Sequence, residues 1–150
     1  MIALLVLLAA ASAHAPAQSA LQPLASFAGH CWRGEAPGKA GVDTHCFEWV
    51  YGGQHLRDRH VVTQNGKPVY EGEALYSADH GRVMFTYWNS LGGLGRGSAS
   101  ASGYDLHFTG TIHAAADSGE QPMVADWHKV ADGYEVREGG SESRLLKRAD

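Results

Sequence analysis

The region from Thr44 to Tyr76 alternates apolar and polar side chains with a period of two, and two turn signals divide it into three predicted strands. Gly52-Gly53 and Asn65-Gly66 are two-residue pairs that tolerate the positive φ angles of a tight hairpin. A two-residue loop at Gly52-Gly53 fixes the register of the first hairpin. It sets three facing pairs: Trp49 with Leu56, Phe47 with Asp58, and His45 with His60.

A two-residue loop at Asn65-Gly66 would fix the register of the second hairpin in the same way. It predicts four facing pairs: Val62 with Val69, His60 with Glu71, Asp58 with Glu73, and Leu56 with Leu75. All of these residues share the face that carries Phe47 and Trp49. One face of the predicted sheet is therefore aromatic with ionisable groups embedded in it.

Short alternating segments continue along the chain, separated by turn signals roughly every 8 to 12 residues. Further strands are expected at His30–Glu35, Arg82–Ser90, Ser98–Tyr104, Asp105–Ala114, Met123–Val130, Tyr134–Glu138 and Ser143–Lys147, with a sheet corner at Leu91–Gly97. Leu21–Gly29 is expected to form a helical turn that plugs one end of a barrel. The pattern predicts an all-β protein, an up-and-down antiparallel β-barrel of about 8–10 strands with a short N-terminal helical turn. It leaves open whether Val83, Phe85 and Tyr87 or Met84, Thr86 and Trp88 face inward.

Two segments resemble the calycin group, which comprises lipocalins, fatty-acid-binding proteins and nitrobindin-like haem-binding barrels. Phe27–Glu35 (FAGHCWRGE) is similar to the Gly-Thr-Trp-Arg-Gly opening of nitrobindin-like domains, and Tyr70–Tyr76 (YEGEALY) is similar to their Glu-containing strand. The chain also resembles exported bacterial members of this group. The haem-ligating histidine of nitrobindin-like barrels lies near the C-terminus, whereas Ser141–Asp150 contains none. What the resemblance implies is a barrel with an interior large enough for a ligand.

The ends of the chain predict an exported protein. An apolar run followed by Ala11-Ser12-Ala13 is typical of a signal peptide covering residues 1–13, and residues 14–22 are expected to form a flexible lead-in before a single domain at 23–150. The predicted location is the periplasm or the extracellular space, with no transmembrane segment after cleavage. The net charge of −4 and the lack of a basic patch argue against a nucleic acid partner.

The two cysteines suit an oxidising compartment. The predicted hairpin places Cys31 directly opposite Cys46, so we expect a disulfide between them, and the same register sets Trp32 opposite His45.

The first functional hypothesis is a binding protein for a small apolar or amphipathic molecule held inside the barrel. The expected wall is Trp32, Phe47, Trp49, Leu56, Phe85, Tyr87, Leu106 and Phe108, and the polar contacts are His60 and Glu73. An alternative is that the same side chains fill the barrel and leave no room for a ligand. The sequence identifies no cofactor.

The second hypothesis is a metal-assisted or acid/base enzyme. Two imidazoles and a carboxylate could hold zinc or iron, and the predicted register places His45, His60 and Glu71 together, close to Asp58 and Glu73. A single bulge would turn half of these residues outward and leave Arg57 and Arg59 inside, where they would suit an anionic head group. The chain contains no Gly-x-Ser-x-Gly, His-Glu-x-x-His or Cys-x-x-Cys motif.

Overall fold

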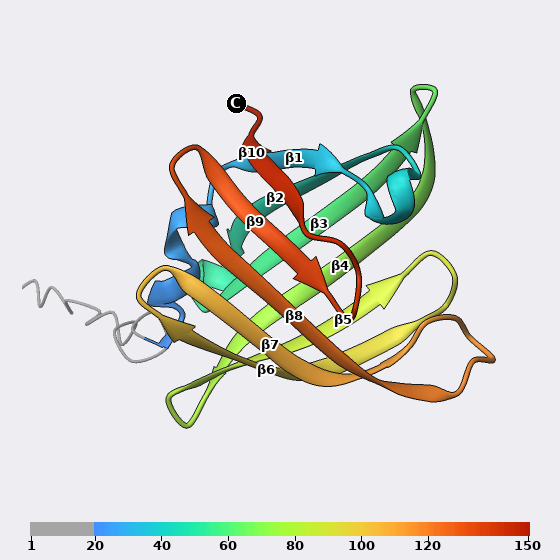
Figure 1. The fold of residues 1–150 in the computed structure, drawn as a ribbon. Coiled ribbons are helices and arrows are strands. Elements are labelled where there is room, and N and C mark those ends of the chain that lie inside the picture. Colours follow the sequence, from blue (N-terminus) through green and yellow to red (C-terminus); the bar gives the residue numbers. More distant parts are fainter. Residues whose placement is uncertain (1–19) are drawn as a thin grey trace, which may run out of the picture.

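The computed structural model describes residues 20–150, so the predicted signal peptide and most of the predicted lead-in lie outside the described residues. Ten antiparallel strands form one closed barrel in which neighbours along the chain are neighbours in the sheet, and β1 closes the barrel against β10 (Figure 1). The strands are β1 (Cys31–Glu35), β2 (Val42–Val50), β3 (His55–Gln64), β4 (Lys67–Asp79), β5 (Arg82–Asn89), β6 (Leu94–Ser102), β7 (Asp105–His113), β8 (Glu120–Val130), β9 (Gly133–Glu138) and β10 (Arg144–Arg148). The predicted up-and-down β-barrel is confirmed.

The first hairpins follow the predicted pairing. Cys31 lies directly opposite Cys46 and forms a disulfide with it, and Trp32 lies opposite His45. His45 in turn lies opposite His60. The connection after β2 is longer than two residues, because Tyr51–Gly53 forms the 3₁₀ turn η3 and Val50 pairs with His55. Each of the two flanking strands is one residue shorter at this turn than a two-residue loop would make it, and the predicted register is unchanged.

The register of the second hairpin differs from the prediction. Asn65 and Gly66 form the expected two-residue turn, with φ angles of 52° and 74°. The pairing then shifts between Val62 and Thr63, because Val62 lies opposite Tyr70 while Thr63 lies opposite Pro68. Val69 is the extra residue of a β-bulge.

The bulge reverses the faces of β4. His60 lies opposite Gly72 rather than Glu71, and Asp58 lies opposite Ala74 rather than Glu73. The prediction that Glu71 and Glu73 point inward is therefore wrong. A shift of one residue exchanges the two faces of a strand, so the two carboxylates face outward, and Tyr70, Ala74 and Tyr76 face the interior.

The strand β5 turns Val83 and Phe85 inward and exposes Trp88. Its neighbour β6 begins within the glycine-rich segment that the sequence pattern assigns to a corner. Gly97 lies opposite Phe85, and a Cβ atom at Gly97 would overlap the Phe85 ring. The glycine thins the barrel wall so that an aromatic side chain fits inside it.

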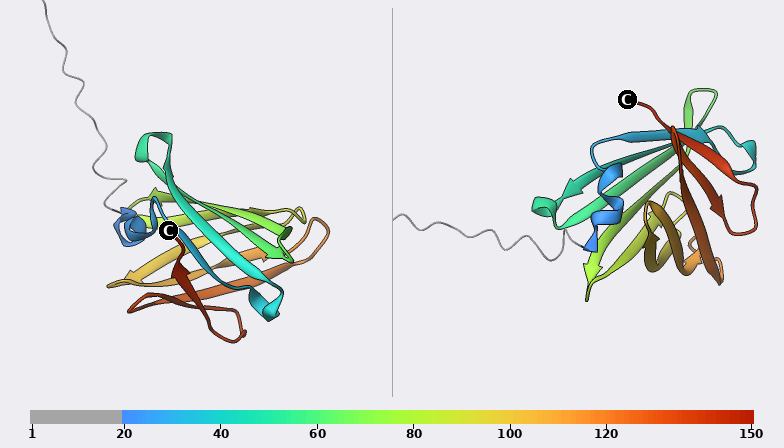
Figure 2. Two further views of the ribbon diagram at one scale, coloured as in Figure 1. Left: turned by 90° about the horizontal axis from the view of Figure 1, so that it is seen from above. Right: turned by 60° about the vertical axis from the view of Figure 1, so that its left-hand side comes forward.

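One end of the barrel is closed by the predicted N-terminal turn, η1 (Gln22–Phe27), which Figure 2 shows lying across the opening. Its side chains Leu24 and Phe27 are fully buried. Phe27 touches several rings, with centroid distances of 5.4 Å to Trp32, 4.9 Å to Phe47 and 4.4 Å to Tyr134. We call this end the plugged half of the barrel. None of the helical turns among residues 20–150 is long and apolar enough to cross a membrane.

Candidate functional site

The other end of the barrel contains a cavity of about 570 Å³, and we call this end the open half. The loop holding the 3₁₀ turn η2 (Pro37–Lys39) and the starts of β4, β8 and β10 border it, all of them at the end of the barrel opposite η1 (Figure 1). Its apolar wall includes Val62, Ala74, Phe85, Phe108, Ile112, Met123, Ala125 and Trp127. Its polar wall consists of Asp43, His45, Asp58, His60, Tyr70, Tyr76, Tyr87, Glu138 and Arg144.

The structure separates the side chains that the sequence assigns to one ligand site. Four of the ten line the cavity, namely His60, Phe85, Tyr87 and Phe108. Trp32, Phe47, Leu56 and Leu106 are buried in the hydrophobic core and do not line it. Trp49 is 36% exposed, and Glu73 lies opposite Arg59 on the outer face of the sheet. The predicted metal ligands His45 and His60 lie together, whereas Glu71 is exposed and points away from them.

His45 lies between two buried carboxylates. Its Nδ1 is 2.8 Å from Asp58 Oδ2, and its Nε2 is 3.1 Å from Asp43 Oδ2. Both ring nitrogens therefore donate protons, which describes an imidazolium ion. Burial by itself lowers the pKa of His45, but the charges and hydrogen bonds of Asp58 and Asp43 outweigh that effect and raise its pKa to about 10.

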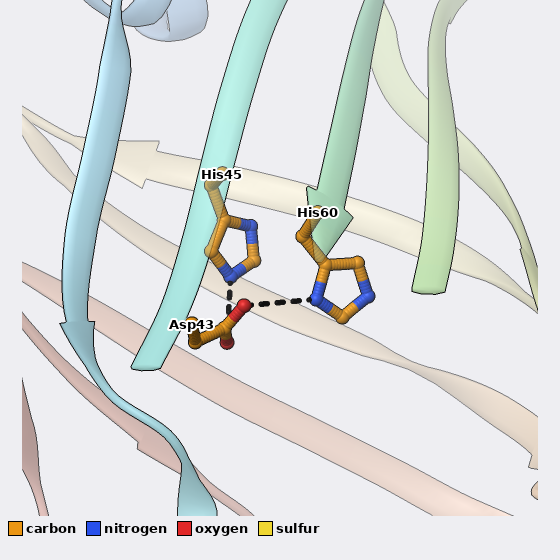
Figure 3. Close-up of side chains that lie close together, drawn as sticks. All are labelled: Asp43, His45 and His60. Atoms are coloured by element: carbon orange, nitrogen blue, oxygen red, sulfur yellow. Dashed lines mark hydrogen bonds and ion pairs between the residues drawn. The ribbon is translucent and has the colours of Figure 1, made fainter. Parts of the chain in front are cut away.

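Asp43 is the centre of the polar wall. Figure 3 shows the rings of His45 and His60 side by side on β2 and β3, with both pointing at the Asp43 carboxylate. Arg144 Nη1 from β10 donates to Asp43 Oδ2 at 3.0 Å. Burial raises the pKa of Asp43, but the hydrogen bonds from His45 and His60 outweigh it and hold that pKa far below its ordinary value. Asp43 is therefore a buried anion with three partners.

A chain of hydrogen bonds leads from Asp43 along the cavity wall. His60 Nδ1 is 3.3 Å from Asp43 Oδ1, and His60 Nε2 is 3.0 Å from the Tyr87 hydroxyl. The Tyr87 hydroxyl is 2.5 Å from that of Tyr70. Burial, and then the bond to Tyr70, raise the pKa of Tyr87, so its phenol stays protonated at neutral pH. Gly72 makes room for this chain, because a Cβ atom there would overlap both His60 and Tyr87.

Asp43, His45 and His60 also form a cluster with the composition of a metal site. One potential ligand atom from each lies within 4.8 Å of the others. A metal needs unprotonated imidazole nitrogens, but both nitrogens of His45 face carboxylates and Arg144 occupies one oxygen of Asp43. The arrangement is that of an ion-pair network in which protons and a guanidinium balance the buried carboxylates.

Sequence reasoning missed Asp43, Tyr70 and Arg144. The alternation that carries His45 and Phe47 extends to Asp43, so the predicted strand began one residue too late to include it. Tyr70 reaches the interior because of the bulge at Val69, which no turn signal announces. Arg144 approaches Asp43 from the other end of the chain, and a single sequence carries no signal for that contact.

Comparisons with protein-family models and with curated proteins give no match to this chain.

Proposed function

We propose that this protein is an exported binding protein that holds one small, mostly apolar molecule in the open half of its barrel. The observation that carries the proposal is the cavity of about 570 Å³, with an apolar wall on one side and an ordered polar network on the other. Cavities of this size and character are typical of sites that enclose a small ligand.

The apolar wall and the polar wall contribute to binding in different ways. Phe85, Phe108 and Trp127 offer aromatic surface that favours the burial of an apolar ring or chain. The hydroxyl groups of Tyr70 and Tyr87 are held in place by their bond to each other and by His60. Fixed polar groups at one wall set the orientation of a ligand whose remaining surface is apolar.

Small side chains keep this half of the barrel open. Ala74 and Ala125 both point into the cavity, where a larger residue would fill the space. The same positions therefore supply a test, because a bulky substitution at either one takes up space inside the cavity.

The test is native mass spectrometry of the protein after export to an oxidising periplasm. The expected result is a non-covalent organic mass, one per chain, that is released on denaturation. The Ala125→Phe variant should lose this mass, because a phenyl ring occupies the cavity. The control is Ala131→Phe, which adds the same ring at an exposed position in the turn after β8. Equal occupancy in both variants, or a bare wild-type chain, would contradict the proposal.

A metal-assisted or acid/base site is the second candidate, favoured by the cluster of Asp43, His45 and His60. Zinc binding there requires His45 to lose a proton and Arg144 to leave Asp43, so it should strengthen as the pH rises. Equilibrium dialysis against Zn²⁺ tests this candidate with the His60→Gln variant. The control is His107→Gln, since His107 is exposed and paired with Asp126 at 2.6 Å. Stoichiometric zinc that only His60→Gln abolishes would favour the metal site.

A further inference from the structure

The wall of the cavity carries one more carboxylate than it carries cations. Asp43, Asp58 and Glu138 contribute three carboxylates, while Arg144 and the imidazolium of His45 contribute two cations. Asp43 and Asp58 are 2% and 4% exposed, so solvent screens them weakly. An anionic group entering this cavity would meet an uncompensated carboxylate, whereas a cationic group would balance it.

The cations of the wall are already paired with carboxylates. Arg144 donates to Asp43 at 3.0 Å through Nη1 and to both oxygens of Glu138 at 3.4 Å through Nη2. Both nitrogens of His45 and both nitrogens of His60 already have partners. Among residues 20–150, Arg144 is the one Lys or Arg side chain that lines the cavity. An incoming anion would therefore compete with carboxylates that already hold these cations.

One acceptor in the wall is unpaired. Asp58 Oδ2 accepts from His45, but Asp58 Oδ1 is buried and has no hydrogen-bond partner among the described residues. A buried carboxylate oxygen without a donor destabilises the protein. The hydroxyl of Tyr76 feels the same negative charge, which adds to burial in raising the pKa of that phenol. Asp58 also lines the cavity, so this unpaired acceptor belongs to the cavity wall.

We infer that the ligand of this cavity is an amphipathic amine or alcohol, neutral or cationic, whose N–H or O–H group is recognised by Asp58, and that the site rejects carboxylates such as fatty acids. This inference rests on the proposed function. Its basis is the excess of carboxylates, the engaged state of Arg144 and the unpaired oxygen of Asp58. The aromatic wall formed by Phe85, Phe108 and Trp127 suits a cation as well as an apolar ring, because the faces of aromatic rings attract positive charge.

The test uses four probes that share one ring system and differ in the group attached to it: ethylnaphthalene, naphthylmethanol, naphthylmethylamine and naphthoic acid. Their affinities for the mature, disulfide-bonded protein are measured by isothermal titration calorimetry at neutral pH. We expect the amine and the alcohol to bind at least about tenfold more tightly than the acid. The uncharged hydrocarbon reports on the cavity alone, independently of any polar recognition.

The outcomes separate the two claims. Binding of the acid as tightly as the amine, with the hydrocarbon also bound, would overturn the inference and leave the proposed function standing. Failure of all four probes to bind would contradict the proposed function itself.

Substitutions locate the recognition. Asp58→Asn removes the unpaired charge, so the preference for amine over acid should shrink by about tenfold. Glu73→Gln removes a carboxylate from the outer face of β4 and should leave the preference unchanged. Asp58 is also hydrogen-bonded to His45, so Asp58→Asn changes more than the charge of the wall. Glu138→Gln is therefore the second variant. It lowers the negative charge of the same wall at a side chain that is 40% exposed, and it should also reduce the preference. An unchanged preference in both wall variants would overturn the inference.

Discussion

The two halves of the barrel are built from the same strands but are filled in different ways. In the plugged half, η1 inserts Leu24 and Phe27 from outside the sheet, and Phe27 packs against rings from several strands. In the open half, small residues and a polar network leave a cavity of about 570 Å³. A closed sheet can surround either a filled or an empty interior. The side chains and the segments outside the sheet decide which of the two it is.

His45 marks the boundary between the two halves. Its ring stacks on His60 at a centroid distance of 4.7 Å and meets the edge of Trp127 at 5.6 Å. Phe47, on the same strand, belongs to the aromatic cluster of the plugged half. The polar network therefore packs against buried aromatic rings, which favours a fixed geometry for the groups that face the cavity.

The largest expected effect comes from emptying the plugged half. Phe27→Ala should lower the free energy of unfolding by about 4 kcal/mol, because it removes a fully buried ring and leaves a void. Affinity for the naphthalene probes should stay nearly constant, since Phe27 does not line the cavity. The matched variant is Phe108→Ala, which removes the same ring from the cavity wall. It should weaken probe binding more and stability less. Urea unfolding and calorimetry measure both quantities, and the reverse pattern would contradict the division into halves.

Removing the disulfide should destabilise the whole barrel without changing the cavity. The Cys31→Ser, Cys46→Ser double variant should lose about 3 kcal/mol of stability, because the bond restricts the unfolded chain between β1 and β2. Neither cysteine lines the cavity, so probe affinity should be retained at temperatures where the variant is folded. The measurement is thermal unfolding with and without reductant. A wild-type melting temperature that does not change on reduction would contradict the claim that this disulfide stabilises the barrel.

The pH dependence of stability tests the polar network. The pKa of His45 is about 10 in the folded protein, above its ordinary value of 6.5, so its contribution is complete below about pH 6.5 and disappears as the pH rises toward 10. The pKa of Asp43 is shifted downward, so its contribution is present above about pH 4 and disappears only in stronger acid.

The free energy of unfolding should therefore fall by a few kcal/mol between pH 6.5 and 10. Urea titrations across this range measure the decline, and His45→Gln should show a much flatter profile. An equally steep decline in that variant would show that His45 is not the group responsible.

The smallest effect on stability is expected from Gly72→Ala, which acts only in the open half. The added methyl group overlaps His60 Nε2 and the Tyr87 hydroxyl, so one of these side chains must move. We expect a loss of about 1 kcal/mol in stability and a clear loss of affinity for naphthylmethanol and naphthylmethylamine. Gly119→Ala is the control, because a Cβ atom there contacts nothing. Unchanged affinities in the Gly72 variant would separate the His60–Tyr87 chain from ligand binding.

The sequence predicts the fold better than the site. Period-two alternation and the turn pairs give the register that joins Cys31 to Cys46 and His45 to His60, because turn signals and alternation act locally. They fail at Val69, where one extra residue reverses the faces of β4. This reversal is the reason that Glu71 and Glu73 do not lie in the predicted site.

The composition of the polar wall depends on contacts that no local pattern encodes. Arg144 meets Asp43 only because β10 closes the barrel against β1. Whether the interior is empty depends on a balance of side-chain volumes around Ala74 and Ala125 that alternation does not measure. A single sequence can therefore predict a barrel here, whereas its cavity and polar wall emerge from long-range packing.

The most direct test of the division into two halves is methyl NMR of the wild-type protein during titration with ethylnaphthalene. The account predicts saturable shifts at Ile112 and Met123, whose side chains line the cavity. It predicts no shifts at Leu24, a buried residue of η1, or at the exposed Leu145. Shifts at Leu24 or Leu145 instead, or no saturable shift at Ile112 and Met123, would contradict the claim that the open half of the barrel is a ligand site.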